Sequence, residues 1–179
     1  MDAVLALDAG AALRGELRGD EAEVFDSLKK SFEAIGMAKV STSAADARRL
    51  GFLRESDEIT MNRARLLSDA KEQARSMADM GYTPPVMRTD VPAPGESVLA
   101  TLKMYVNLMR EGEYISDHDV KVVNWAAYAL CGGNVKPGTV VTEQYLLDLE
   151  REAFLSLCGE KKTQERIGFT LKTGKPLRN

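Results

Sequence analysis

The sequence of 179 residues has little of the chemistry on which enzymes most often depend. It contains a single histidine, His118, and only two cysteines, Cys131 and Cys158. A zinc site takes four nitrogen or sulfur ligands, or three and a water, so the sequence predicts no metal site. Two cysteines also cannot build the disulfide framework of a small secreted domain.

Glycine-rich phosphate loops and long apolar runs are missing as well. Neither G-x-G-x-x-G nor G-x-x-x-x-G-K-[ST] occurs, which argues against a nucleotide-binding turn in this chain. The one glycine pair, Gly132-Gly133, follows a predicted helix, and we interpret it as a C-terminal helix cap. No apolar run reaches the roughly 20 residues of a membrane span. The N-terminus also lacks the basic region of a secretory signal, so we expect a cytoplasmic protein.

The charge balance excludes another class of protein. Lysine and arginine number 24 and aspartate and glutamate 27, a net charge of −3. Nucleic-acid binding relies on a strong excess of basic residues, so we expect no nucleic-acid partner.

What the sequence does have is helical periodicity along most of its length. Apolar residues recur every three or four positions, the spacing of an amphipathic helix with one face toward a core. The sequence predicts an all-α fold of about seven helices. Eight segments have a helical pattern, and the periodicity of the first is loose: 4–13, 20–35, 44–50, 60–80, 96–111, 117–130, 143–157 and 161–172.

A proline-rich strap is expected to divide these helices into two halves. Residues 83–95 hold four of the six prolines, and proline fixes the backbone and removes a hydrogen-bond donor. We therefore predict a helical region at 1–82, a linker at 83–95 and a second helical region at 96–179. Residues 135–141, which contain another Pro-Gly pair, are expected to form a loop.

Few side chains qualify as catalytic groups. His118 stands between Asp117 and Asp119 and could form a catalytic pair with one of them. Residues adjacent in a helix do not face each other, so a solvated first turn is favoured. The two cysteines are interpreted as small buried apolar residues. A solvated helix surface is favoured for the acidic residues Asp148, Glu150 and Glu152.

The last twenty residues are basic in an otherwise acidic chain. From Glu160 to Asn179 there are six basic and two acidic residues, a local charge of +4. Such a cluster could attract phosphate groups. Lysines near the C-terminus of a helix also suit the helix dipole without binding anything, and both interpretations stay open at this point.

Several motifs resemble the C-terminal part of crotonase-superfamily proteins. These are EREAFLSL at 150–157, Glu165-Arg166-Ile167 and LKTGKP at 171–176. Residues 39–53 resemble a helix of the same family, with Asp46 where a glutamate is usual. The segments 113–119 and 130–134 resemble an insert of one bacterial subgroup, which joins a 3-hydroxyacyl-CoA dehydrogenase to an enoyl-CoA hydratase.

The resemblance implies a piece of a fatty-acid β-oxidation enzyme that uses NAD and CoA thioesters. No catalytic residue of the family matches a position here, so no catalytic residue is assigned and no cofactor is expected in this chain alone. By position, Phe169, Lys172 and Lys175 match the segment that contacts the CoA adenine and phosphates. The expected partners are acyl-CoA, the rest of the parent enzyme and further copies in a homo-oligomer.

Two other functions fit the same residues. One is a stand-alone helical interaction module without catalysis, which evolved from such an enzyme. The other is a small helical carrier of CoA or acyl-CoA. We expect the chain to act as a structural and assembly module that completes an acyl-CoA site.

Overall fold

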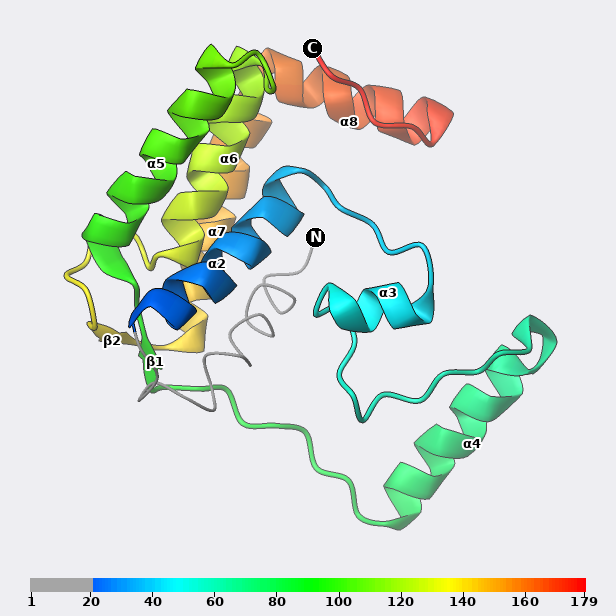
Figure 1. The fold of residues 1–179 in the computed structure, drawn as a ribbon. Coiled ribbons are helices and arrows are strands. Elements are labelled where there is room, and N and C mark those ends of the chain that lie inside the picture. The colour runs from blue at the N-terminus through cyan, green and yellow to red at the C-terminus, as the bar shows by residue number, and fades with distance from the viewer. Residues whose placement is uncertain (1–20) are drawn as a thin grey trace. The chain divides into compact units, whose positions relative to one another are not determined.

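The computed structural model describes residues 21–179, which form seven α-helices and one two-stranded sheet (Figure 1). The all-α prediction is confirmed. The helix predicted over 4–13 lies outside the described residues. The elements are α2 (Glu21–Gly36), α3 (Ala44–Arg49), the short 3-10 helix η1 (Arg63–Arg65), α4 (Leu66–Asp79), β1 (Val91–Pro92), α5 (Gly95–Glu111), α6 (Asp117–Leu130), β2 (Val140–Val141), α7 (Glu143–Cys158) and α8 (Lys161–Thr173).

The helices do not group as the proline-rich strap suggests. One compact unit joins residues 21–39 to residues 88–179, and residues 40–87 form a second unit. The sequence grouped α2 with α3 and α4 in a region 1–82. In the structure α2 packs on α6, from the other side of the strap. Helix α2 joins the later helices because its apolar face is buried against residues that lie far along the chain.

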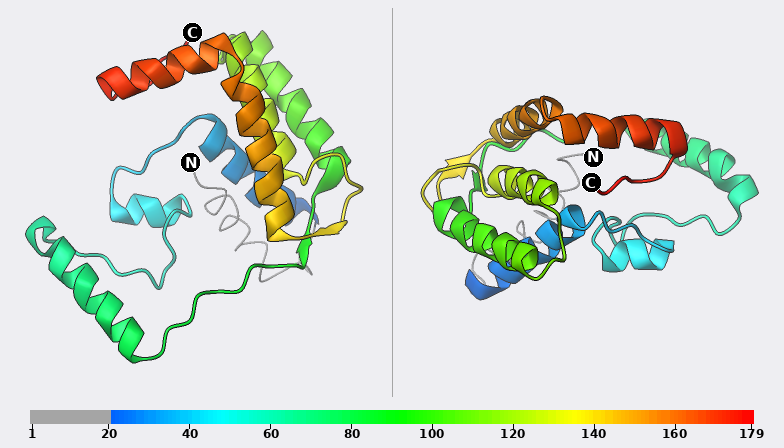
Figure 2. Two further views of the ribbon diagram at one scale, coloured as in Figure 1. Left: turned by 180° about the vertical axis from the view of Figure 1, so that it is seen from behind. Right: turned by 90° about the horizontal axis from the view of Figure 1, so that it is seen from above.

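The core of the larger unit surrounds α6, which contacts α2, α5 and α7 (Figures 1 and 2). Phe32 of α2 is 2% exposed and inserts into a cluster supplied by α2, α5 and the α6 region. Burying a side chain of this size is worth about 1.5–3 kcal/mol. The buried members of the cluster are Leu28, Phe32, Leu99, Leu102, Val106, Val123, Ala127 and Cys131.

Two segments predicted as irregular pair with each other. Val91 and Pro92 lie antiparallel to Val141 and Val140. The strap therefore ends in a short strand, and the loop at 135–141 supplies the other one. Such two-residue strands carry no periodic signal, which is why the sequence did not predict the pairing.

The same loop and the C-terminal cap of α6 contact the beginning of α5. The amide of Gly95 donates to the carbonyl of Cys131 at 3.0 Å, and the amide of Glu96 donates to Val135 at 2.8 Å. These bonds satisfy donors that a helix N-terminus leaves free. Gly95 has φ +78°, and a Cβ there would lie 2.5 Å from the nitrogen of Pro137. Only glycine fits this position without moving backbone.

Helix capping follows the sequence closely. Ser116 and Asp119 form a reciprocal capping box at the start of α6, and Thr142 caps α7 through the amide of Tyr145. Gly132 follows α6 with φ +76°, which confirms the predicted C-terminal turn.

The smaller unit, residues 40–87, buries very little. Ala47 of α3 is buried, and the carbonyls of Glu55 and Asp57 accept hydrogen bonds from the Arg48 guanidinium. Helix α4 has no buried residue, and Leu66 and Leu67 are mostly exposed. Within residues 21–179, none of the helices has the length and apolar character to cross a bilayer.

Candidate functional site

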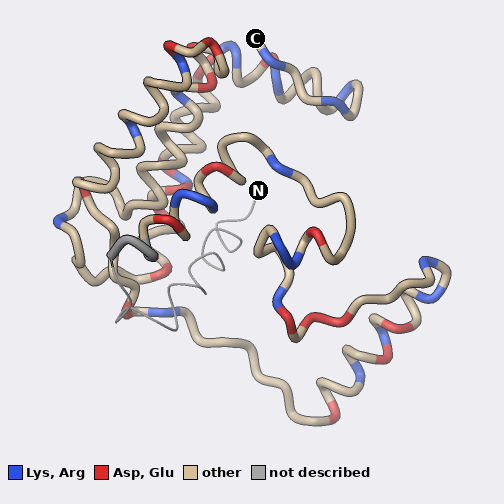
Figure 3. Tube along the Cα trace, viewed as in Figure 1, with Lys and Arg blue, Asp and Glu red and all other residues tan. Residues whose placement is uncertain are grey.

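The basic arm, which we define as α8 with residues 174–179, carries the candidate CoA-binding residues. After Gly159 the chain turns sharply from α7 into α8 (Figure 2). Helix α8 ends at Gly174, whose φ of +69° marks a left-handed C-terminal cap. Basic residues are distributed along α8 and the tail beyond it, as the coloured Cα trace shows (Figure 3).

The structure places all three predicted site residues on the surface of this arm. Phe169 is 37% exposed, and Lys172 and Lys175 are exposed as well. Phe169 and Lys172 are three residues apart in one helix, so they are neighbours on its surface. Lys175 lies beyond the cap, where its amide donates to Thr173 Oγ1 at 3.2 Å and its carbonyl accepts from Thr170 Oγ1 at 3.2 Å. The arm therefore presents one aromatic ring and two ammonium groups to solvent.

Arg166 links the basic arm to the beginning of α6 through hydrogen bonds and an ion pair. Its Nη1 donates to Asp119 Oδ1 at 2.7 Å, and its Nε donates to Asn179 Oδ1 at 2.8 Å. Nη2 lies 3.3 Å from the main-chain oxygen of Asn179, and that oxygen also accepts from Ser116 Oγ at 3.1 Å. The side chains of Arg166 and Asp119 are only 20% and 18% exposed.

The same contacts set the charge state of Asp119. Burial raises the pKa of this carboxyl group, but hydrogen bonds from Ser116 and Arg166 outweigh burial. The pKa of Asp119 consequently lies below its usual range, so the carboxylate stays charged opposite the guanidinium.

His118 is the second attachment point, and the interpretation of a solvated first turn is wrong for it. The residue is 3% exposed, and its Nε2 shares a hydrogen bond of 2.9 Å with Thr163 Oγ1 of α8. Burial, and next the charge of Arg166, lower its pKa. The ring is thus kept neutral and bonded across two helices, which is a structural position rather than a catalytic pair with Asp117.

The remaining sequence candidates have structural explanations. Cys131 is fully buried, as predicted, and burial raises the pKa of its thiol to about 12. Cys158 is half-buried. Asp148 is exposed on α7, where it accepts from Gln144 and Arg151 at 2.9 Å each. In the part of the chain that the structure describes, no three His, Cys, Asp or Glu side chains are grouped so as to hold a metal ion.

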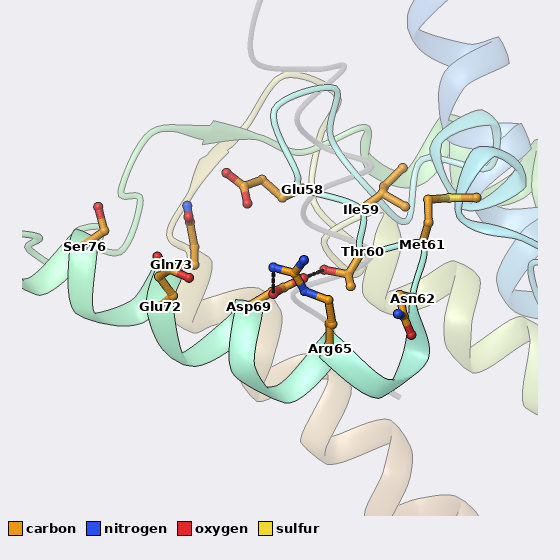
Figure 4. A pocket seen from close by; sticks show the side chains of 10 residues that line it. All are labelled: Glu58, Ile59, Thr60, Met61, Asn62, Arg65, Asp69, Glu72, Gln73 and Ser76. Atoms are coloured by element: carbon orange, nitrogen blue, oxygen red, sulfur yellow. Dashed lines mark hydrogen bonds and ion pairs between the residues drawn. The ribbon is translucent and has the colours of Figure 1, made fainter.

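The smaller unit has a shallow polar groove of about 600 Å³ along α4 (Figure 4). Residues 58–62 form one side, and Asp69 lies at its centre, bonded to Thr60 at 3.2 Å and to Arg65 at 3.3 Å. Glu58 and Glu72 also line the groove. None of its lining side chains is buried, so the groove lacks the desolvation that makes an active-site acid or base effective.

A comparison with known proteins shows a long stretch of similarity to a curated protein. A protein of Bacillus subtilis (strain 168), described as a probable 3-hydroxyacyl-CoA dehydrogenase, is 50% identical to this chain over 154 residues. The chain is similar to part of a dehydrogenase. The match covers 86% of this chain and 19% of the relative, so the chain spans about a fifth of the length of the relative it matches. No family model matches the chain, and no solved structure does.

Sequence reasoning missed the residues that hold the arm in place. Arg166 and Asp119 are 47 positions apart, and His118 and Thr163 are 45 apart. Periodicity and capping rules describe only neighbours along the chain. The sequence carries no local signal for the burial of His118. Once the structure shows that burial, a hydrogen-bond partner such as Thr163 is expected, because buried polar groups are almost always hydrogen-bonded.

Proposed function

We propose that this chain is a helical part of a 3-hydroxyacyl-CoA dehydrogenase of fatty-acid β-oxidation. The observation that carries the proposal is the 50% identity over 154 residues with the Bacillus protein. The chain would correspond to the C-terminal region of the longer enzyme, which uses NAD and acyl-CoA thioesters. Hydration of enoyl-CoA by the same enzyme rests on the crotonase resemblance of the sequence alone.

Within that enzyme, we assign the basic arm to the binding of the CoA moiety. Lys172 and Lys175 would make charge-assisted contacts with the CoA phosphates, and the exposed ring of Phe169 would cover the adenine. The local charge of +4 supports this assignment. The role of the chain would be to complete an acyl-CoA site whose reacting groups belong to the rest of the enzyme.

Calorimetric titration of the purified chain with CoA tests this assignment. We expect binding that weakens with added salt and that is lost in the double variant Lys172→Gln, Lys175→Gln. The matched control is Lys103→Gln, which removes an exposed lysine from α5. No heat at millimolar CoA, or equal binding by the double variant and the control, would contradict the assignment.

Turnover is the second measurement. We expect no NAD-dependent oxidation of 3-hydroxybutyryl-CoA by this chain alone, because none of its described side chains is arranged as a catalytic pair. Measurable oxidation by the purified chain would contradict the proposed division of roles.

A stand-alone interaction module is the alternative, and the exposure of α4 favours it. A helix with no buried residue leaves its apolar side chains available to another protein or to a second copy. Sedimentation of the purified chain tests whether the chain associates with a second copy of itself. A clean monomer at high concentration would count against self-association and against the expected homo-oligomer.

A further inference from the structure

We infer that Arg166 and His118 are positioning residues for the basic arm. The inference rests on the proposed function, since it concerns how Phe169, Lys172 and Lys175 are presented to CoA. Its starting point is that α8 has no buried residue. Apolar packing therefore does little to fix its direction, and polar contacts must do so.

Those contacts form a polar anchor, which we define as the Arg166–Asp119 ion pair and the His118–Thr163 hydrogen bond. Both join α8 to the first turn of α6, at 2.7 Å and 2.9 Å. A third contact lies just before α8, where Lys121 Nζ is 2.9 Å from Glu160 Oε1. That pair is more exposed than the anchor, so water weakens it further.

Arginine is required for this arrangement by its shape as well as its charge. The guanidinium of Arg166 reaches Asp119 with Nη1, Asn179 Oδ1 with Nε and the Asn179 main chain with Nη2. These acceptors lie in different directions around one planar group. A lysine ammonium keeps the charge but cannot serve all three through a planar fork.

The anchored face and the proposed ligand face of α8 are different. Lys172 follows Thr163 by nine positions, which places it roughly 180° around the helix axis. Around the same axis, Phe169 lies between Thr163 and Lys172. Contacts of Thr163 and Arg166 with α6 therefore leave the side of α8 that bears Lys172 open. Ile167 and Leu171 of α8 are also exposed, so apolar contacts do not substitute for the anchor.

The test compares Arg166→Lys with the matched control Arg151→Lys. Arg151 is an exposed arginine on α7 with an ion pair to Asp148 at 2.9 Å. Net charge is the same in both variants, so a loss of CoA binding cannot come from lost attraction. We expect Arg166→Lys to weaken CoA binding about tenfold and to speed amide hydrogen exchange in 161–173 by a similar factor. Exchange in 95–111 should not change, whereas a general loss of stability would raise it.

A second variant tests the other half of the anchor. Thr163→Val removes the hydroxyl group and leaves Nε2 of His118 buried without this partner. We expect faster exchange confined to α8 and weaker CoA binding, again without a change in 95–111.

The outcomes separate the anchor from the proposed function. Unchanged α8 exchange in Arg166→Lys would overturn the anchor. Faster α8 exchange with unaltered CoA affinity would overturn its positioning role. If the unmodified chain does not bind CoA, the assignment of the arm to CoA fails, and hydrogen exchange still decides whether the anchor exists. Equal effects of Arg166→Lys and Arg151→Lys would also overturn the inference.

Discussion

Replacing Phe32 with alanine should reveal how strongly α2 belongs to the unit that contains α5–α7. The ring is 2% exposed and lies in a cluster with residues of α5 and α6. Substitution of a buried phenylalanine by alanine costs about 3–5 kcal/mol, from lost transfer free energy and from the cavity that remains. A domain has only about 5–15 kcal/mol of stability, so the effect is a large part of the total.

Urea denaturation followed by tryptophan fluorescence measures this loss. Trp125 is the only tryptophan of the chain and lies in α6, with its ring 5.5 Å from that of Tyr128. Its signal therefore reports on the unit to which α2 is attached. A matched control is Leu67→Ala in α4, where the side chain is 68% exposed and the expected change is within about 0.5 kcal/mol. Equal midpoints for the two variants would refute the placement of Phe32 in this core.

Three further predictions follow from single residues. Gly95→Ala should lower the free energy of unfolding, measured in urea, by at least about 2 kcal/mol, because the strain of a positive φ adds to a backbone clash. Gly138→Ala is the control, because it has the positive φ but no atom within 4 Å of the added Cβ. Equal losses of stability in the two variants would contradict the clash. The pKa of His118 lies below 6.5 because burial, Arg166 and Lys162 outweigh Glu160 and Asp119. The unfolded state then binds more protons, so stability should decline as the pH falls below about 6.5. His118→Gln should abolish that part of the decline, and an identical pH profile would refute it. Cys131 should react with a thiol reagent only after unfolding, whereas Cys158 should react in the folded chain; labelling of native Cys131 would contradict its burial.

Local features of the fold were predictable from the sequence, and its long-range pairings were not. The capping box at Ser116 and the cap at Thr142 were identified because each acts within three residues. The helices were identified because 3.6-residue periodicity is also local. The attachment of α2 to α6 depends on which apolar faces match in three dimensions, and periodicity only shows that a face exists.

The candidate site shows the same limit. The charge of the basic arm and the residues Phe169, Lys172 and Lys175 could be chosen from composition and resemblance. The burial of His118 could not be predicted, because a histidine between two aspartates is usually exposed to solvent. Its hydrogen bond to Thr163 exists only because α8 folds back on the first turn of α6.

The larger unit is assembled from two separated stretches of chain, and this has a consequence for its synthesis. The hydroxyl of Tyr105 donates to Glu33 Oε1 at 3.1 Å across 72 positions. At about 5–20 residues per second, a ribosome takes about 4–14 s to bridge that interval. Helix α2 therefore emerges from the ribosome before α5 and α6 are made, and its apolar face stays uncovered until they follow. Nascent chains stalled before α5 should therefore be far more sensitive to proteases and chaperones than chains released after α6.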